Sequence, residues 1–256
     1  MQSTKTPTFA GKAEKSWKGF EEVYVPTSKG EIFYRHKPGT GKPIILIHGI
    51  GSDSRTWRKL MDFMPQNLDI YALDLIGNGK SDAPDMKYDV IALENCVEEF
   101  AERLKIKKPI VLGHSYGGWV AAEYALKKEV EALILEDSNG MENHMNALKK
   151  AGDNEAWKAS VLAEALKIGG KEQTVRSMEE TMDDHRLTQE QLSSISCKTL
   201  IIWGENDAII GTDVAREFNS LIRGSKLVII PEGEHVPHIF QKEVVGEVIG
   251  NFLKTV

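Results

Sequence analysis

Cysteine is scarce in this chain, and the two cysteines present do not form a recognisable site. Cys96 and Cys197 lie far apart among the 256 residues and lack the spacing of metal ligands. Two cysteines are no disulfide framework, so a reducing compartment, the cytoplasm, is the simpler expectation. Cys96 falls in a helical stretch and Cys197 just before a strand, where we expect packing roles.

Long apolar runs and a basic excess are also missing. No run is long enough to span a bilayer, and residues 1–19 are polar, without the apolar core of a signal peptide. The formal net charge is −6, whereas a phosphate-binding surface needs Lys and Arg gathered together. We therefore expect neither a membrane nor a nucleic acid as a partner. Hydrophobic content of 41% and charged content of 27% instead suit a globular chain of one large or two small domains.

The most informative stretch runs from Pro109 to Val120. Ile110 to Leu112 is apolar and β-branched and predicts a buried strand, and the spacing of apolar residues after Gly118 predicts a helix. Between them stands Gly-His-Ser-Tyr-Gly, residues 113–117. A strand that turns into a helix in so few residues needs small neighbours around a strained tip residue, which here is Ser115.

This motif in its strand–turn–helix context resembles the nucleophile elbow of the α/β-hydrolase superfamily. The resemblance implies a serine hydrolase similar to carboxylesterases, with Ser115 as its nucleophile. No cofactor is expected, and no cluster of His, Cys, Asp and Glu in the sequence suggests a metal site. Haloalkane dehalogenases and epoxide hydrolases are disfavoured, because the resemblance would then demand Asp at position 115.

Alternating strands and helices favour an α/β fold built on a parallel sheet with helices on both faces. The strands are expected at residues 21–26, 31–36, 44–47, 68–73, 110–112, 132–136, 199–203 and 226–230. Helices are expected at 54–64, 90–104, after the elbow, at 213–221 and from 237 to the C-terminus. This order fits an α/β-hydrolase fold of about eight strands. The predicted division is an N-terminal arm (1–19), a core (20–140 and 195–256) and a small helical cap (141–194).

A serine nucleophile needs a histidine base, and the family order Ser, acid, His directs the search downstream of Ser115. His235 follows the last apolar strand, at the strand end where such sheets collect catalytic groups, and its loop resembles the family's Gly-x-x-His-x-Pro segment with Gly233 one place closer. His238 is expected at a helix start or pocket wall, and His144 and His185 on the surface of the cap.

Three carboxylates compete for the role of the triad acid. Asp207 lies just past a strand end in a segment that resembles the family's Gly-x-x-Asp. Glu205 is two residues earlier, and Asp137 ends the strand after the elbow, where some family members place their acid. We favour Asp207, although Asp137 stays open as a replacement.

The family's oxyanion hole uses two backbone N–H groups. The resemblance assigns them to Tyr116, directly after the nucleophile, and to Ile50, in the loop after the first apolar strand. His48 and His114 are expected to be structural. The glycine-rich loop from Asp74 to Asp82 lacks the P-loop frame and is expected to form a structural turn.

The resulting hypothesis is a serine esterase that cleaves carboxylic esters of small to medium acyl chains through an acyl-enzyme. One alternative keeps the triad but cleaves carbon–carbon bonds, or acts as a cofactor-free haloperoxidase or perhydrolase. Another is a ligand receptor of the same fold. The expected partner is a small-molecule ester, and the expected state is a monomer or homodimer.

Overall fold

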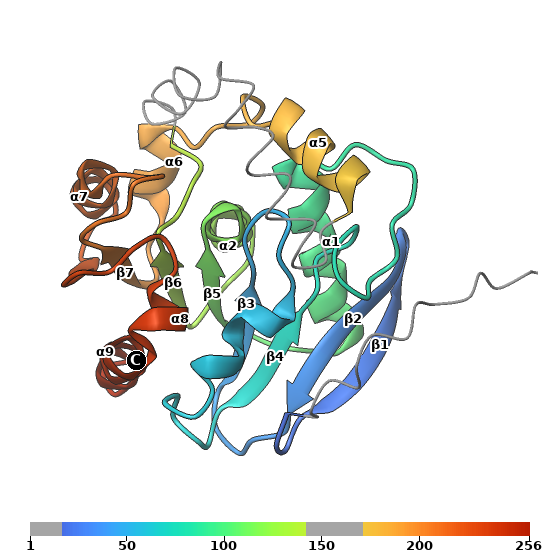
Figure 1. Ribbon diagram of the computed structural model, residues 1–256, viewed down its shortest axis with the longest axis horizontal. Coiled ribbons are helices and arrows are strands. Elements are labelled where there is room, and N and C mark those ends of the chain that lie inside the picture. The colour runs from blue at the N-terminus through green and yellow to red at the C-terminus, as the bar shows by residue number, and fades with distance from the viewer. Residues whose placement is uncertain (1–16, 142–170) are drawn as a thin grey trace, which may run out of the picture.

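The computed structural model describes residues 17–141 and 171–256, which are organised around one eight-stranded sheet (Figure 1). The strand order is β1-β2-β4-β3-β5-β6-β7-β8. The strands are β1 (Glu21–Thr27), β2 (Gly30–Lys37), β3 (Pro43–Ile47), β4 (Asp69–Leu73), β5 (Ile110–His114), β6 (Ala132–Glu136), β7 (Lys198–Gly204) and β8 (Lys226–Ile230). The predicted α/β-hydrolase fold is confirmed.

The sheet combines an antiparallel edge with a parallel centre. β1 and β2 form the expected hairpin, β2 pairs antiparallel with β4, and all later neighbours are parallel. The chain runs from β3 outward to β4, then crosses back to place β5 on the other side of β3. Ligands of such sheets bind at the carboxyl ends of the strands beside this reversal, which is where β5 delivers Ser115.

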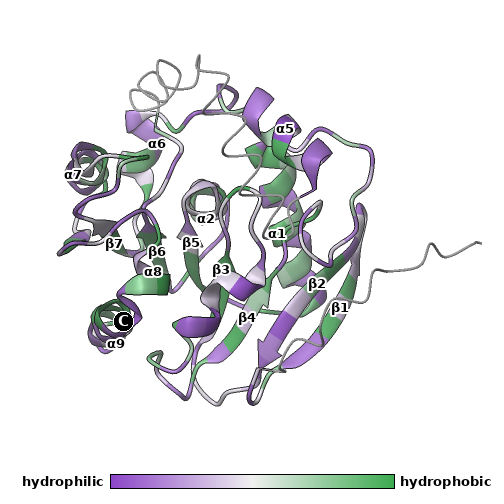
Figure 2. Cartoon of the chain, in the orientation of Figure 1, coloured by the Kyte–Doolittle hydropathy of each residue, from purple (hydrophilic) through white to green (hydrophobic). Residues whose placement is uncertain are grey.

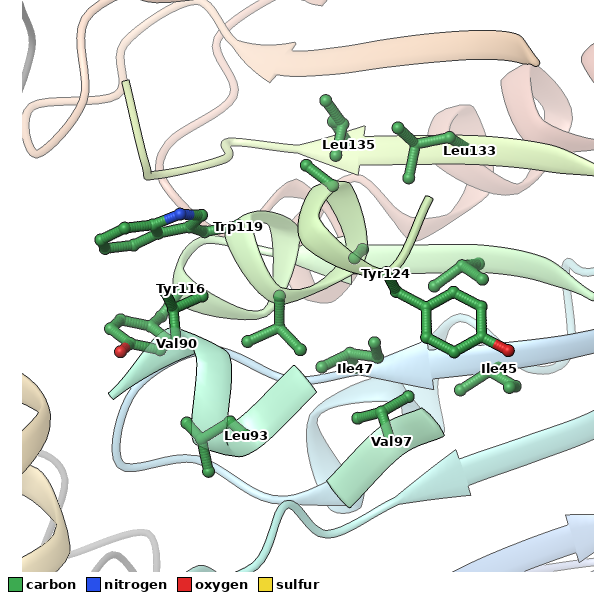
Figure 3. Packing of buried hydrophobic residues seen from close by; sticks show 14 of the residues in the cluster. Ile45, Ile47, Val90, Leu93, Val97, Tyr116, Trp119, Tyr124, Leu133 and Leu135 are labelled. Atoms are coloured by element: carbon green, nitrogen blue, oxygen red, sulfur yellow. The ribbon is translucent and has the colours of Figure 1, made fainter. Parts of the chain in front are cut away.

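Alternating side chains of the central strands build a core on each face of the sheet. On one face, Ile45 and Ile47 of β3 and Leu133 and Leu135 of β6 pack against α1 (Val90–Arg103) and α2 (Tyr116–Lys127), as Figure 3 shows. α7 (Thr212–Leu221) covers the same face.

The opposite face is covered by the 3₁₀ helix η1 (Ser54–Lys59) and by α9 (Lys242–Leu253) (Figure 1). Ile44 and Leu46 of β3 point to this side. In Figure 2 the central strands are mostly hydrophobic, as expected for strands buried on both sides. The outer helices carry both hydrophobic and hydrophilic residues.

The predicted cap lies partly outside the described residues, which leave out 1–16 and 142–170. Its described part holds α5 (Glu172–Glu180) and α6 (Gln189–Ser194). Thr188 starts α6 with a capping box, in which its hydroxyl accepts from the Gln191 amide and the Gln191 side chain accepts from the Thr188 amide. The division into arm, core and cap stays a prediction.

Two helices differ from the sequence expectation. The helix expected at 54–64 is only the short η1, after which turns of the same i to i+3 type continue, with Leu60 N donating to Trp57 O and Phe63 N to Leu60 O. Apolar residues at three- and four-residue spacing suit a 3₁₀ segment and an α-helix alike. The last helix is divided into α8 (Pro237–Phe240) and α9 at Gln241, whose backbone is non-helical (φ −112°, ψ 36°).

Across 17–141 and 171–256, no helix combines the length and the apolar character needed to cross a bilayer.

Candidate active site

Ser115 stands at the tip of the sharp turn between β5 and α2. Its backbone has φ 54° and ψ −120°, a conformation that L-residues seldom adopt. The turn is held by backbone hydrogen bonds, since the Ser115 amide donates to Glu136 O at 2.9 Å and the Gly118 amide donates to Ser115 O at 2.9 Å. This strain positions the side chain at the N-terminus of α2, at the carboxyl edge of the sheet.

The glycines on either side of the turn are required by close backbone packing. A Cβ atom at Gly113 would lie 2.1 Å from Gly117 O, and one at Gly117 would lie 2.3 Å from His48 O. Any larger residue would push α2 away from β5 or from the loop after β3. The motif is therefore a steric requirement of the turn.

The base predicted from the sequence reaches the serine. His235 lies in the loop between β8 and α8, and its Nε2 is 3.0 Å from Ser115 Oγ. Its Nδ1 is 2.7 Å from Asp207 Oδ2. The structure thus brings together a hydroxyl, an imidazole and a carboxylate from distant parts of the chain, in the order expected of a serine nucleophile, a base and an acid.

Asp207 is fixed by the short loop that follows β7. Its Oδ1 accepts from the amides of Ile209 at 2.8 Å and Ile210 at 2.9 Å, which leaves Oδ2 for His235. The loop itself is anchored where Trp203 Nε1 donates to Ile210 O at 2.8 Å. The carboxylate is therefore oriented independently of its histidine partner.

The loops that carry the acid and the base are tied to each other. The Asn206 amide donates to Gly233 O at 2.7 Å, and the Glu232 amide donates to Glu205 Oε2 at 3.0 Å. Gly204 permits this approach, because a Cβ there would lie 2.2 Å from Glu234 O. Glu205, one of the competing acids, is exposed and braces this junction.

The surroundings of Asp207 favour its ionised form. Burial acts to raise the pKa of this carboxyl, but the hydrogen bond and charge of His235 and the two backbone amides outweigh it, so that the pKa is lowered. A carboxylate that is ionised at neutral pH can orient the imidazole and stabilise its protonated form.

The two expected oxyanion donors belong to residues that flank or adjoin the Ser115 turn. Tyr116 is the first residue of α2, so its N–H has no partner within the helix. Gly49 approaches Ser115 so closely that a Cβ on it would lie 3.2 Å from Ser115 Cβ, and Ile50 is the next residue. The assignment of these two donors stays a prediction.

The histidines expected to be structural make buried contacts. His48 accepts from the Leu75 amide at 2.9 Å through Nε2, with its Nδ1 2.8 Å from Gly49 O, which links the loops after β3 and β4. His114 Nε2 lies 2.7 Å from His235 O. Burial, followed by the neighbouring His238 and His235, holds the pKa of His114 well below its ordinary value, so a neutral ring holds the backbone of the base.

His238 forms a buried pair that the sequence did not indicate. Its amide donates to Glu136 Oε1 at 2.9 Å, its Nδ1 lies 3.0 Å from Glu136 Oε2, and its Nε2 lies 2.7 Å from Thr56 Oγ1. These contacts join α8, β6 and η1 directly below the site. His185 is exposed, and His144 lies outside the described residues.

Asp137, the remaining competitor for the acid, is buried beside the triad. Its Oδ1 accepts from the Gly204 amide at 2.9 Å. One carboxylate oxygen from each of Asp137 and Asp207 and one ring nitrogen of His235 lie within 4.8 Å of one another. In the described part of the chain, this spacing would allow the three atoms to bind a metal ion. The direct contact with His235 Nδ1 is made by Asp207.

The glycine-rich loop from Asp74 to Asp82 is a hydrogen-bonded turn, as expected. Asp74 accepts from the amides of Ser54 and Lys80, each at 2.8 Å, and Ser81 Oγ donates to Asp74 O at 2.6 Å. A Cβ at Gly79 would lie 2.1 Å from Asp74 Oδ2. The turn thus binds its own carboxylate and connects β4 to η1.

Comparison with known proteins agrees with the α/β-hydrolase fold. The model of the alpha/beta hydrolase fold matches residues 42–165. A membrane phospholipase A, described as a bacterial virulence factor, superimposes with a TM-score of 0.78 at 24% identity over 93% of this chain and 86% of its own. An esterase from Exiguobacterium antarcticum gives 0.77 at 20% identity over 91% and 100%. Residues 42–165 thus match the α/β-hydrolase family model, and the likeness to the solved structures is one of fold.

Curated relatives resemble only part of the chain. An uncharacterized protein of Mycobacterium tuberculosis is 37% identical over 110 residues, which are 42% of this chain and 32% of that protein. The 1-acylglycerol-3-phosphate O-acyltransferase ABHD5 of Rattus norvegicus is 34% identical over 110 residues, 41% of this chain and 31% of the relative. The matched segment thus spans about a third of these relatives.

Proposed function

We propose that this protein is a serine hydrolase that cleaves carboxylic esters of small to medium acyl chains through an acyl-enzyme. The observation that carries the proposal is the continuous contact from Ser115 Oγ to His235 Nε2 (3.0 Å) and from His235 Nδ1 to Asp207 Oδ2 (2.7 Å). A hydroxyl, an imidazole and a carboxylate in this arrangement are what acyl transfer requires.

In the first half-reaction, Ser115 Oγ attacks the ester carbonyl while His235 Nε2 takes its proton. Asp207 holds the Nδ1 proton and stabilises the imidazolium. The amides of Tyr116 and Ile50 donate to the developing oxyanion. When the tetrahedral intermediate collapses, the carbon–oxygen bond to the alcohol breaks and His235 gives its proton to that oxygen.

In the second half-reaction, water replaces the alcohol. His235 takes a proton from the water, whose oxygen attacks the acyl carbonyl, and collapse returns the proton to Ser115 Oγ and releases the carboxylic acid. An alcohol in place of water would give acyl transfer, the chemistry in the name of the ABHD5 relative. We propose hydrolysis because the triad needs only water.

The remaining parts of the proposal concern partners and location. The substrate is a small-molecule ester, the protein acts in the cytoplasm as a monomer or homodimer, and neither nucleic acid nor membrane takes part. The near burial of Ser115, whose exposed fraction is 7%, favours a substrate that enters an enclosed site.

The test is a panel of p-nitrophenyl esters from acetate to palmitate, measured with the wild type, with Ser115→Ala and with the exposed control Ser193→Ala. We expect multiple turnovers with the shorter esters in the wild type. Ser115→Ala should lose this turnover, and the control Ser193→Ala should keep it. Turnover only on a ring-fission product, or only with hydrogen peroxide, would favour the other reactions of this triad, and binding without turnover would favour a receptor.

A further inference from the structure

The carboxyl group of Asp137 lies next to the carboxylate of the triad. Asp137 follows the last residue of β6, and its backbone φ of 44° turns the chain toward β7, where its Oδ1 accepts from the Gly204 amide at 2.9 Å. One carboxylate oxygen from each of Asp137 and Asp207 and one ring nitrogen of His235 all lie within 4.8 Å of one another. Asp137 is fully buried, with an exposed fraction of 0%.

Two carboxyl groups this close and this buried do not both ionise, since their charges repel without water to screen them. Hydrogen bonds decide which one holds the charge. Asp207 accepts from His235 Nδ1 and from two backbone amides. Asp137 accepts from one amide, and its buried Oδ2 has no hydrogen-bond partner among residues 17–141 and 171–256 when both groups are treated as acceptors.

We propose that Asp137 is a neutral carboxylic acid whose O–H donates to the Asp207 carboxylate, and that it is thereby a positioning residue for the triad. The proposal rests on the serine hydrolase function stated above. A protonated Asp137 gives the orphaned Oδ2 a role as donor, and it gives Asp207 a fourth hydrogen bond that fixes the carboxylate facing His235.

The electrostatic surroundings agree with this assignment. Burial raises the pKa of Asp137 well above its ordinary value, the neighbouring charges of Glu136 and Asp207 add to the effect, and the Gly204 amide only partly opposes it. Glu136 faces His238 on the other side of the strand end. A neutral Asp137 leaves the carboxylate of Asp207 as the one negative charge of this carboxyl pair beside His235.

Asparagine is a close mimic of the proposed neutral acid. Its carbonyl can accept from Gly204 and its NH₂ can donate to Asp207, and it tolerates the positive φ as well as aspartate does. Asp137→Asn should therefore keep kcat and the acid limb of the pH profile of kcat/KM. The exposed Asp213→Asn in the first turn of α7, which also replaces an aspartate carboxylate by an amide, serves as the control.

Asp137→Ala removes both the donor and the acceptor. We expect kcat to fall on the order of tenfold, the factor for one hydrogen bond to a charged group, with KM little changed. Recovery in Asp137→Asn but not in Asp137→Ala supports a positioning role. If Asp137→Ala is poorly folded, the infrared C=O band of a protonated carboxylic acid, present in the wild type at neutral pH and absent in Asp137→Asn, tests the same point directly.

Three results would overturn the proposal. If Asp137 were ionised, Asp137→Asn would shift the acid limb of the kcat/KM profile to lower pH by roughly two units, the effect of removing one charge a few ångströms away. Absence of the acid band in the wild type would also exclude a neutral Asp137, and so would loss of activity on chelation with recovery on adding a divalent ion. Failure of a fluorophosphonate to label Ser115 would instead contradict the proposed function itself.

Discussion

Asp207→Asn should disable the base by reversing its tautomer. Asp207 Oδ1 accepts from the Ile209 and Ile210 amides at 2.8 and 2.9 Å, and the asparagine carbonyl would keep these two bonds. Its NH₂ then faces His235 Nδ1, which must accept, so the ring proton moves to Nε2. That nitrogen lies 3.0 Å from Ser115 Oγ and would point a proton at the nucleophile it should deprotonate.

The expected cost follows from losing the base while the site stays assembled. The same change in a serine protease lowers kcat on the order of 10⁴-fold, and we expect a similar loss here, about 5.5 kcal/mol of transition-state stabilisation. KM should change little, because the Asp207 side chain is fully buried and is out of reach of an ester. Steady-state hydrolysis of p-nitrophenyl butyrate at neutral pH measures both constants.

The matched control is Asp213→Asn, which removes an exposed carboxylate from the first turn of α7. It should keep kcat within about twofold, since salt and water screen the charge of an exposed side chain. Retention of more than about a tenth of kcat in Asp207→Asn would refute the tautomer reasoning. If that activity vanished in Asp207→Asn combined with Asp137→Asn, Asp137 would be the acid.

Three further predictions concern stability. The pKa of Asp207 is lower in the folded protein than in the unfolded chain, where it is about 4, so this group stabilises the fold above pH 4 and the contribution is lost as pH falls through the pKa of the folded state. In urea unfolding, Asp207→Asn should therefore be less stable than the wild type at pH 7, with a smaller difference near pH 3. The raised pKa of Asp137 has the opposite effect on stability, since the wild type loses stability as pH rises from about 4 toward the pKa of Asp137 in the folded state. Asp137→Asn should therefore show a higher Tm than the wild type near pH 8, and an equal or lower Tm would contradict the buried neutral acid. Gly113→Ala, whose Cβ would meet Gly117 O at 2.1 Å, should cost about 1–3 kcal/mol of unfolding free energy, whereas Gly250→Ala in α9, with its nearest neighbour at 3.9 Å, should be neutral or stabilising.

The parts of the fold that the sequence predicted are those with local steric or periodic causes. Ile44 to Ile47 and Ile110 to Leu112 are buried on both faces of the sheet, so they read as uninterrupted apolar runs. The elbow was recognisable because Gly113 and Gly117 are needed wherever a strand turns so sharply onto a helix. These requirements act within a few residues.

Features that depend on tertiary contacts were not predictable. The chain after η1 continues in 3₁₀-type turns rather than in an α-helix, although the apolar spacing of Trp57, Leu60 and Met61 suits both. His238 pairs with Glu136, a residue 102 positions away in the sequence, and no local sequence pattern predicts this contact. The sequence could name Asp137 as a competitor for the acid, but only the geometry separates its contact with Gly204 from the contact of Asp207 with His235.

The most direct test of the account is covalent labelling of the native protein with a fluorophosphonate, followed by peptide mapping by mass spectrometry. We predict one adduct, on the peptide that holds Ser115, with labelling slowed in Asp207→Asn and absent in Ser115→Ala. An unlabelled wild type, or an adduct on another serine that persists in Ser115→Ala, would contradict the claim that Ser115 is an activated nucleophile.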